Sequence, residues 1–296
     1  MTELAYVNGV FCPMAEAKVS IEDRGFQFGD GVYEVIVAYD GHPFLPEEHL
    51  VRLKRSADAL GLDFEPESYG LMQIVIDGLH RSQIGDALIY IQITRGTAPR
   101  SHVIPAGLEP TVVVTFRERA PVPPPLRENG VSVMTLPETR WARCCVKAIT
   151  LLPNVLAKNE ALRRGHYDAV FVTADGEVRE CTSANLFLVH GTRISIPRRT
   201  ESILHGVTQG FILECASNLG MEVEERRVAA DELYDAGELF MSGTTVEVLA
   251  ITTVDDKRVG DGRVGPVCRQ LHEEFVATRR AISTGRAARL KASQCV

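Results

Sequence analysis

Apolar and polar residues alternate along two segments in the first half of the chain. Every second position from Tyr33 to Tyr39 is apolar or aromatic, and three isoleucines repeat this spacing within 88–94. A period of two is typical of a β-strand with one buried face. We therefore predict strands at 32–39 and 88–94, and a short buried strand at 112–116.

Helical spacing separates the first two predicted strands. Leucine and alanine recur at intervals of three and four residues between Pro46 and Gly61. This spacing places them on one face of a helix that begins near the proline and ends at the glycine. A second helix is predicted from about residue 67 to residue 80.

A proline-rich run from Pro121 to Pro125 interrupts this pattern. Proline fixes φ and lacks an N–H, so we expect neither a helix nor a central strand there, but a stiff connector. Downstream, strands and helices mix without the regular alternation of a parallel sheet. The strands are expected at 131–135, 168–173, 185–189, 222–227, 238–241 and 247–254, and the helices at 153–164, 207–219 and 266–281.

Composition and charge exclude several classes of protein. Lys and Arg number 32 against 39 Asp and Glu, so no basic surface for a nucleic acid is expected. No apolar run approaches the roughly 18 residues of a membrane span, and the N-terminus does not resemble a secretory signal. Seven cysteines without a C-x-x-C pair predict a reducing cytoplasm, and no histidine spacing indicates a metal site.

Lys147 is the first candidate for chemistry, because it lies in the apolar stretch 144–149. A desolvated lysine loses its charge readily and becomes a nucleophile for aldehydes. The alternative is a lysine at a strand end whose ammonium reaches water. Lys158 is the rival nucleophile, but its position on a polar helix face predicts a solvated side chain.

Glu180 precedes a turn rich in hydroxyl groups, 181–185. A carboxylate at this point could keep a pyridinium nitrogen protonated. A carboxylate that only caps the turn is the alternative.

Two turns of small residues could hold a phosphate by their backbone N–H groups. Gly206-Val207-Thr208 opens a predicted helix, and 242–245 follows a predicted strand. Arg52 could supply a fixed positive charge, although an exposed arginine on a helix is the simpler interpretation. The loop 95–102 holds Arg95, Arg100 and His102, which together suit a small carboxylate unless the loop is plain surface.

Taken together and in their order along the chain, these candidate segments resemble those of the fold-type IV pyridoxal-phosphate enzymes. The resemblance is greatest to the D-amino-acid branch of that family. The group also includes branched-chain aminotransferases and aminodeoxychorismate lyase. The resemblance covers the chain to about residue 254. It is carried by EDRGFQFGDGVYEV (22–35), IQITRGTAPRSH (91–102), RWARCCVKAITLLPNVLAKNEA (140–161), ECTSAN (180–185), LHGVT (204–208) and SGTT (242–245).

The resemblance implies a mixed α/β fold with two domains. A small N-terminal α/β domain at 1–120 would be joined by a linker at 121–126 to a larger cofactor-binding domain at 127–281 with a mixed, barrel-like sheet. The segment 282–296 would form a flexible tail. A homodimer with shared active sites is also implied.

The resemblance further assigns roles to individual residues. Lys147 would hold pyridoxal 5′-phosphate as a Schiff base, and Glu180 would bind the pyridine nitrogen. The other implied cofactor contacts are Arg52, Val207, Thr208, Thr244, Ser183 and Leu204. The substrate carboxylate would be bound by Tyr33 and by Arg100 and His102 from the neighbouring subunit, with Val35 also lining the substrate site.

The implied reaction is transamination between D-amino acids, such as D-alanine and D-glutamate, and 2-oxo acids by a ping-pong mechanism. A branched-chain L-amino-acid or (R)-amine transaminase, an aminodeoxychorismate lyase and a non-enzymatic binding protein are the alternatives. Gln209, Ala184 and Val37 depart from the family pattern. The first two affect the expected phosphate binding and the third the expected substrate range.

Overall fold

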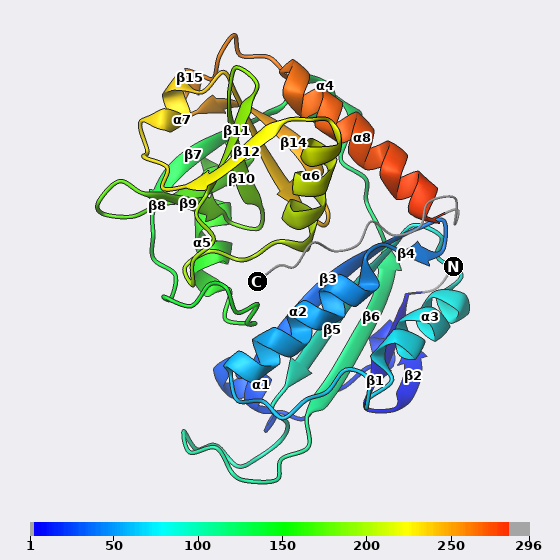
Figure 1. The fold of residues 1–296 in the computed structure, drawn as a ribbon. Helices are drawn as coiled ribbons and strands as arrows, with labels where there is room; N and C mark the ends of the chain where they lie inside the picture. The colour runs from blue at the N-terminus through cyan, green and yellow to red at the C-terminus, as the bar shows by residue number, and fades with distance from the viewer. Residues whose placement is uncertain (1–2, 284–296) are drawn as a thin grey trace. The chain divides into compact units, whose positions relative to one another are not determined.

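The computed structural model describes residues 3–283 (Figure 1). Their contacts divide the chain into two compact units. The first comprises the chain up to Ala120 together with Val146–Thr150, and the second comprises Pro121–Cys145 and the chain from Leu151 onward.

The first unit is built on a six-stranded antiparallel sheet in the order β2-β1-β6-β5-β3-β4. Helix α2 packs against β3, and α3 packs against β1 and β6. Proline at the first turn of α2 costs no hydrogen bond, and Leu53 and Ala57 bury its apolar face. The elements are β1 (Leu4–Val7), β2 (Val10–Pro13), η1 (Met14–Glu16), α1 (Arg24–Phe28), β3 (Gly31–Tyr39), β4 (His42–Pro43), α2 (Pro46–Ala59), α3 (Leu71–Ser82), β5 (Ala87–Thr94) and β6 (Thr111–Glu118).

The segment Val146–Thr150 completes the first unit by pairing with the start of β3. The Tyr33 N–H donates to the Lys147 carbonyl at 3.0 Å, and the Ile149 N–H donates to the Gly31 carbonyl at 3.1 Å. Val32 and Ala148 form an antiparallel bridge. This part of the chain therefore satisfies backbone groups of β3 that β5 does not reach.

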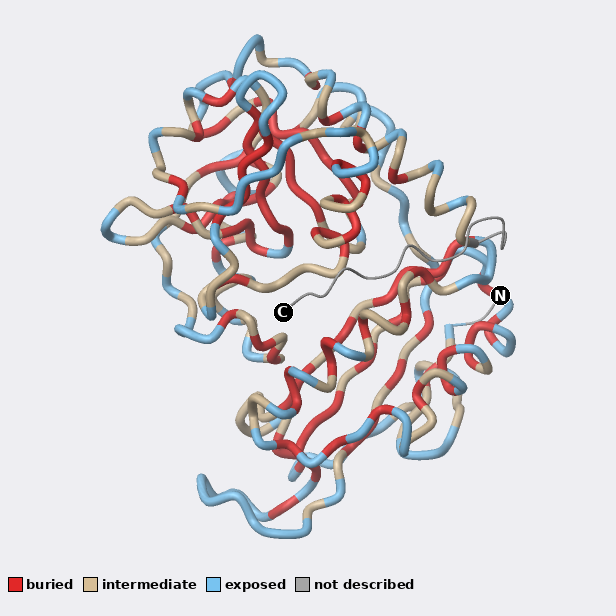
Figure 2. Tube along the Cα trace, in the orientation of Figure 1, coloured by how far each residue is buried: buried red, intermediate tan, exposed pale blue. Residues whose placement is uncertain are grey.

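The second unit contains a mixed sheet in the order β12-β11-β10-β13-β14-β7-β8-β9, with β15 paired to β14. Strand β9, at one end of the sheet, also contacts β10 and β11, so the sheet curls around a core that Figure 2 shows as buried. Helices α6 and α8 pack on β13 and β14, with Phe211 and Phe275 in edge contact at 5.4 Å. The elements are α4 (Pro124–Asn129), β7 (Val131–Pro137), α5 (Leu152–Arg163), β8 (Asp168–Val172), β9 (Val178–Cys181), β10 (Asn185–His190), β11 (Arg193–Pro197), α6 (Val207–Asn218), β12 (Glu222–Arg226), α7 (Glu232–Asp235), β13 (Glu238–Gly243), β14 (Glu247–Val254), β15 (Lys257–Arg258) and α8 (Pro266–Ser283).

The predicted mixed α/β class and barrel-like sheet are confirmed, although some elements differ from their predicted bounds and some short strands were not predicted. Helix α4 begins at Pro124, inside the run for which no helix was expected, because proline is tolerated in the first turn, where N–H groups have no partner anyway. Helix α3 begins at Leu71, about four residues later than predicted. The predicted tail from residue 284 onward lies outside the described residues, and residues 282 and 283 form the end of α8.

Candidate active site

Lys147 lies in the first unit, between the buried residues Val146 and Ala148. Its backbone N–H donates to Ser56 Oγ at 3.2 Å, and its Nζ lies 4.3 Å from the centre of the Tyr33 ring. Tyr33 itself stands on β3 and packs against Tyr90, with their ring centres 5.7 Å apart. Strand β3 and helix α2 thus hold the backbone of the proposed nucleophile from two sides, and Tyr33 on β3 places an aromatic face beside its amine.

Lys158, the rival nucleophile, lies on α5 in the second unit. Its ammonium forms an ion pair with the buried carboxylate of Asp168 at 3.2 Å and donates to the Tyr167 carbonyl. The expectation of a solvated side chain was incomplete, because the side chain is about one third exposed and its charge is paired. Its ammonium is therefore engaged by two oxygen acceptors of the second unit.

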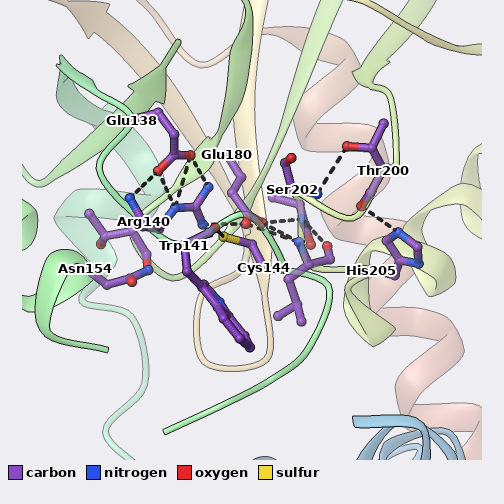
Figure 3. A network of polar contacts seen from close by, with 12 residues as sticks. Glu138, Arg140, Trp141, Cys144, Asn154, Glu180, Thr200, Ser202 and His205 are labelled. Carbon is purple, nitrogen blue, oxygen red and sulfur yellow. Dashed lines mark hydrogen bonds and ion pairs between the residues drawn. The ribbon is translucent and has the colours of Figure 1, made fainter. Parts of the chain in front are cut away.

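Glu180 is buried at the end of β9 and accepts hydrogen bonds from three directions (Figure 3). Arg140 Nη1 donates to Oε1 at 2.6 Å, Asn185 Nδ2 donates to Oε2 at 3.0 Å, and the Leu204 N–H donates to Oε1 at 3.1 Å. The guanidinium of Arg140 is held in turn by Glu138 at 2.7 Å and lies 4.4 Å from the centre of the Phe171 ring. The carboxylate is therefore fixed in position by charged and neutral donors together.

The acidity of Glu180 reflects two opposing effects. Burial raises its pKa, and the charge and hydrogen bonds of Arg140, with the Leu204 N–H, oppose that rise. Burial favours the neutral acid, whereas Arg140 and the Leu204 N–H favour the ionised carboxylate, which is the form that can accept a hydrogen bond from a protonated ring nitrogen.

Asn185 connects Glu180 to the beginning of α6. Its Nδ2 also donates to the Leu204 carbonyl at 2.8 Å. A Cβ atom at Gly206 would come within 2.1 Å of Asn185 Oδ1, so only glycine fits this close approach. No side chain caps helix α6 at Gly206. The N–H groups of its first turn therefore remain available beside Gly206 and Asn185.

The end of β13 lies next to the turn that follows Glu180, because Ser242 pairs with Asn185 in the sheet. A Cβ atom at Gly243 would lie 3.2 Å from the Ser183 carbonyl. Ser242 Oγ and Gln209 Oε1 are buried, and neither has a hydrogen-bond partner among residues 3–283. Buried polar atoms without a protein partner are uncommon, so a bound group that exchanges hydrogen bonds with them would fit at this place.

Arg52 was predicted as an exposed or phosphate-binding residue, and the structure buries it on α2. Its Nε and Nη2 donate to the two carboxylate oxygens of Glu34 at 2.6 and 2.9 Å, and His49 Nδ1 lies 2.7 Å from Glu34 Oε2. The alternation along β3 drew attention to the residues on the other face of the strand, and no sequence signal paired Glu34 with α2. Glu34, His49, Arg140 and Asn185 are the site residues that the sequence analysis missed.

The sequence analysis expected the loop 95–102 to present its three basic residues together, and the structure shows a different arrangement. Arg95 is buried, and its guanidinium pairs with Asp30 at 2.9 Å and donates to the carbonyls of Leu60 and Gly61. Arg100 and His102 are exposed, and both contact the ring of Phe28. The loop thus offers two donors, because the carboxylate of Asp30 engages the third basic residue.

The residues of the second unit fit the phosphate and ring nitrogen of pyridoxal phosphate. The open first turn of α6, the glycines at 206 and 243 and the unpartnered Ser242 hydroxyl form a donor set suited to an anion. Val207 and Thr208 lie in the first turn of α6, and Thr244 follows the end of β13. Ser183 and Leu204 flank Glu180. Three residues depart from the family pattern, and all three are buried: Gln209, Ala184 and Val37.

The model of the class IV amino-transferase family matches residues 31–254 of the chain. The D-alanine aminotransferase of Bacillus licheniformis is 39% identical over 267 residues, which are 89% of this chain and 93% of that protein. The D-alanine aminotransferase of Staphylococcus haemolyticus is 37% identical over 91% of this chain and 95% of its own length.

Solved structures agree with the family match. The branched-chain amino acid aminotransferase of Escherichia coli superposes with a TM-score of 0.86 at 27% identity, over 98% of this chain and 97% of that one. The branched-chain amino acid aminotransferase of T.th., solved with pyridoxamine 5′-phosphate, gives a TM-score of 0.84 at 29% identity, over 97% of this chain and 96% of that one. The chain belongs to the class IV amino-transferases, a family of pyridoxal-phosphate enzymes.

Proposed function

We propose that this enzyme transfers amino groups between D-amino acids, with D-alanine and D-glutamate as the expected donors, and 2-oxo acids. Relatives named D-alanine aminotransferase are 36–39% identical over about nine tenths of the chain. The observation that carries the proposal is the pair Arg100 and His102, two exposed donors on one short loop against the ring of Phe28. A guanidinium with a neighbouring imidazole suits a carboxylate.

The cofactor would be held by a small set of side chains and backbone groups. Lys147 would bond its aldehyde carbon, and Glu180 would bind its ring nitrogen. When bound, pyridoxal phosphate supplies an aldehyde for amino groups and a ring that withdraws electrons from the adjacent carbon. Its phosphate and ring would be held by the backbone N–H groups of Val207, Thr208 and Thr244, with support from Arg52, Ser183 and Leu204.

The reaction then depends on proton transfers by this chain's side chains. The Lys147 amine would take the proton from the substrate Cα as a base and later return it as an acid. The carboxylate of Glu180, which Arg140 and Asn185 fix in position, would bind the protonated ring nitrogen. The amino acid would be oriented with its Cα proton toward Lys147 by Tyr33, Val35, Arg100 and His102.

A homodimer is part of this proposal, with Arg100 and His102 serving the neighbouring subunit. Helix α5 supports it with an exposed apolar stripe at Leu152, Val155, Leu156 and Leu162. An exposed apolar stripe on a helix is typical of an interface.

The proposed location is the cytoplasm. The six cysteines among the described residues are free thiols, which fits a reducing compartment. Among residues 3–283, no helix is long and apolar enough to cross a membrane.

A branched-chain L-amino-acid transaminase is the second candidate, because the superposed E. coli and T.th. structures carry that activity in their names. Arg100→Ala separates the two. Loss of a charge-assisted contact to the substrate should cost roughly 2–5 kcal/mol of binding, so the KM for D-alanine should rise steeply while the absorbance of the bound cofactor is unchanged.

The kinetics should be measured with D-alanine, L-leucine and an amine without a carboxylate, with the exposed Arg117→Ala as the matched control. Little change with L-leucine, in a protein that uses L-leucine faster than D-alanine, would favour the branched-chain assignment. Equal losses with all three substrates would remove Arg100 from the carboxylate site.

A further inference from the structure

The side chain of Phe28, at the end of α1, contacts both proposed carboxylate donors. The guanidinium carbon of Arg100 lies 4.5 Å from the centre of its ring. The His102 ring meets it edge-on, with ring centres 5.6 Å apart and an interplanar angle of 65°. One aromatic side chain thus connects two residues of a loop that is exposed from residue 99 to residue 107 (Figure 2).

Arg100 has few other restraints within residues 3–283. Besides the contact with Phe28, its Nη1 donates to the Gln27 carbonyl at 3.2 Å. A free arginine side chain occupies many rotamers. Fixing it in one rotamer costs conformational entropy, and this cost is among the largest of all side chains. A cation over an aromatic ring offsets part of this cost before the substrate arrives.

Phe28 is itself held firmly by the polar network beneath the loop. Arg24, which is buried, lies 4.9 Å from the Phe28 ring centre, pairs with Asp30 at 2.8 Å and donates to the Ser101 carbonyl at 2.8 Å. Asp30 also pairs with Arg95 at the start of the loop. The segment 24–30 therefore forms one connected structure with the loop at both Arg95 and Ser101.

We propose that Phe28 is a positioning residue that holds Arg100 and His102 in the arrangement that binds the substrate carboxylate. This inference rests on the proposed function, because it deepens the role given there to the two donors. Phe28 contributes no polar group to the substrate. It acts by reducing the number of conformations that the two donors adopt.

The test compares Phe28→Leu, which keeps an apolar side chain but removes the ring, with Phe28→Tyr, which keeps the ring. The matched control is Phe26→Leu, on the same helix, because the Phe26 side chain is 73% exposed. We expect Phe28→Leu to raise the KM for D-alanine on the order of ten-fold with a smaller change in kcat. Phe28→Tyr and Phe26→Leu should remain close to the wild type.

A second readout does not depend on activity. Arg100 is followed by Ser101 in the exposed part of the loop, so trypsin cleavage at this bond reports how well the loop is held. Phe28→Leu should accelerate that cleavage severalfold, and Phe26→Leu should not. In the Arg100→Ala background, Phe28→Leu should raise the KM less than it does in the wild type, because only its effect through His102 remains.

The outcomes distinguish the inference from the function on which it rests. Unchanged cleavage in Phe28→Leu, or additive losses with Arg100→Ala, would overturn the positioning role. Faster cleavage with an unchanged KM for D-alanine would show that Phe28 holds the loop but that Arg100 and His102 do not bind the carboxylate, which overturns the proposed carboxylate site.

Discussion

Two lysines illustrate how the environment of one residue determines its chemistry. Lys158 is paired with the buried Asp168, whereas Lys147 lies over the Tyr33 ring between two buried apolar neighbours. Lys158 was expected on a polar helix face, and its ion pair with a residue ten positions away in the chain gave no local signal. The choice of Lys147 came from the family resemblance as much as from its apolar surroundings.

Lys147→Ala should abolish transamination while the fold survives, because the bond to the cofactor and the proton transfer are lost together. Loss of a catalytic group of this kind typically costs several orders of magnitude in kcat. Lys158→Ala serves as the control and should keep activity with reduced stability, since it leaves Asp168 buried without its cation. Borohydride reduction of the wild type followed by peptide mapping is the measurement, and a label on Lys158 would refute the assignment.

At the scale of elements, strands and helices with a strong apolar period were predictable, and pairings between distant elements were not. Strands β3 and β5 and helices α2, α5 and α6 were expected within a few residues of their observed bounds. Strands β1, β2 and β11 were missed, because short segments with mixed polarity gain their order from neighbouring strands.

The same limit applied to the candidate site. The turns at 206–208 and 242–245 could be recognised from small residues beside a helix or strand. The burial of Arg52 by Glu34, and of Arg95 by Asp30, depends on carboxylates 18 and 65 residues away in the chain. A sequence pattern indicates which residues lie on one face only when those residues recur at the period of a helix or a strand. These two ion pairs join separate elements and have no such period.

The packing of α2 on β3 creates a pH-dependent element of stability. Burial alone would raise the pKa of Glu34, but Arg52 and His49 hold that pKa well below its usual range. Burial lowers the pKa of His49, and Glu34 only partly opposes this effect. Both groups therefore bind protons more readily in the unfolded chain, so this contribution to stability is complete above about pH 6.5 and decreases as the pH falls.

Glu34→Gln should destabilise the protein by about 3 kcal/mol at pH 7, because it leaves the buried Arg52 without its anionic partner. It should also flatten the loss of stability below about pH 4.5, while the part due to His49 remains. Urea unfolding at about pH 7, 5.5, 4 and 3 measures both effects, with the exposed Glu118→Gln as control. Parallel curves for Glu34→Gln and the wild type would contradict this account.

At the scale of the whole molecule, the proposed homodimer makes a quantitative prediction for mixed subunits. Lys147→Ala and Arg100→Ala inactivate different parts of a shared site, so a heterodimer of the two variants would contain one intact site. Random re-association makes about half of the dimers mixed, and about a quarter of the wild-type activity should return.

The dimer itself is tested with Leu156→Glu, which places a charge in the exposed stripe of α5. This variant should sediment as a monomer, whereas Ile76→Glu, at an exposed apolar position on α3, should not change the assembly. No recovery of activity in the mixture, with wild-type sedimentation throughout, would mean that each subunit supplies its own Arg100 and His102.

The placement of Val146–Thr150 has a consequence for synthesis on the ribosome. The chain leaves the first unit after Ala120, contributes Pro121–Cys145 to the second, and only then returns the segment that pairs with residues 31–33. The first unit cannot be complete when its own sheet has been translated, and the edge of β3 waits for a segment made later. The lysine proposed for catalysis arrives on that same segment, so the step that closes the N-terminal sheet also delivers the reactive amine.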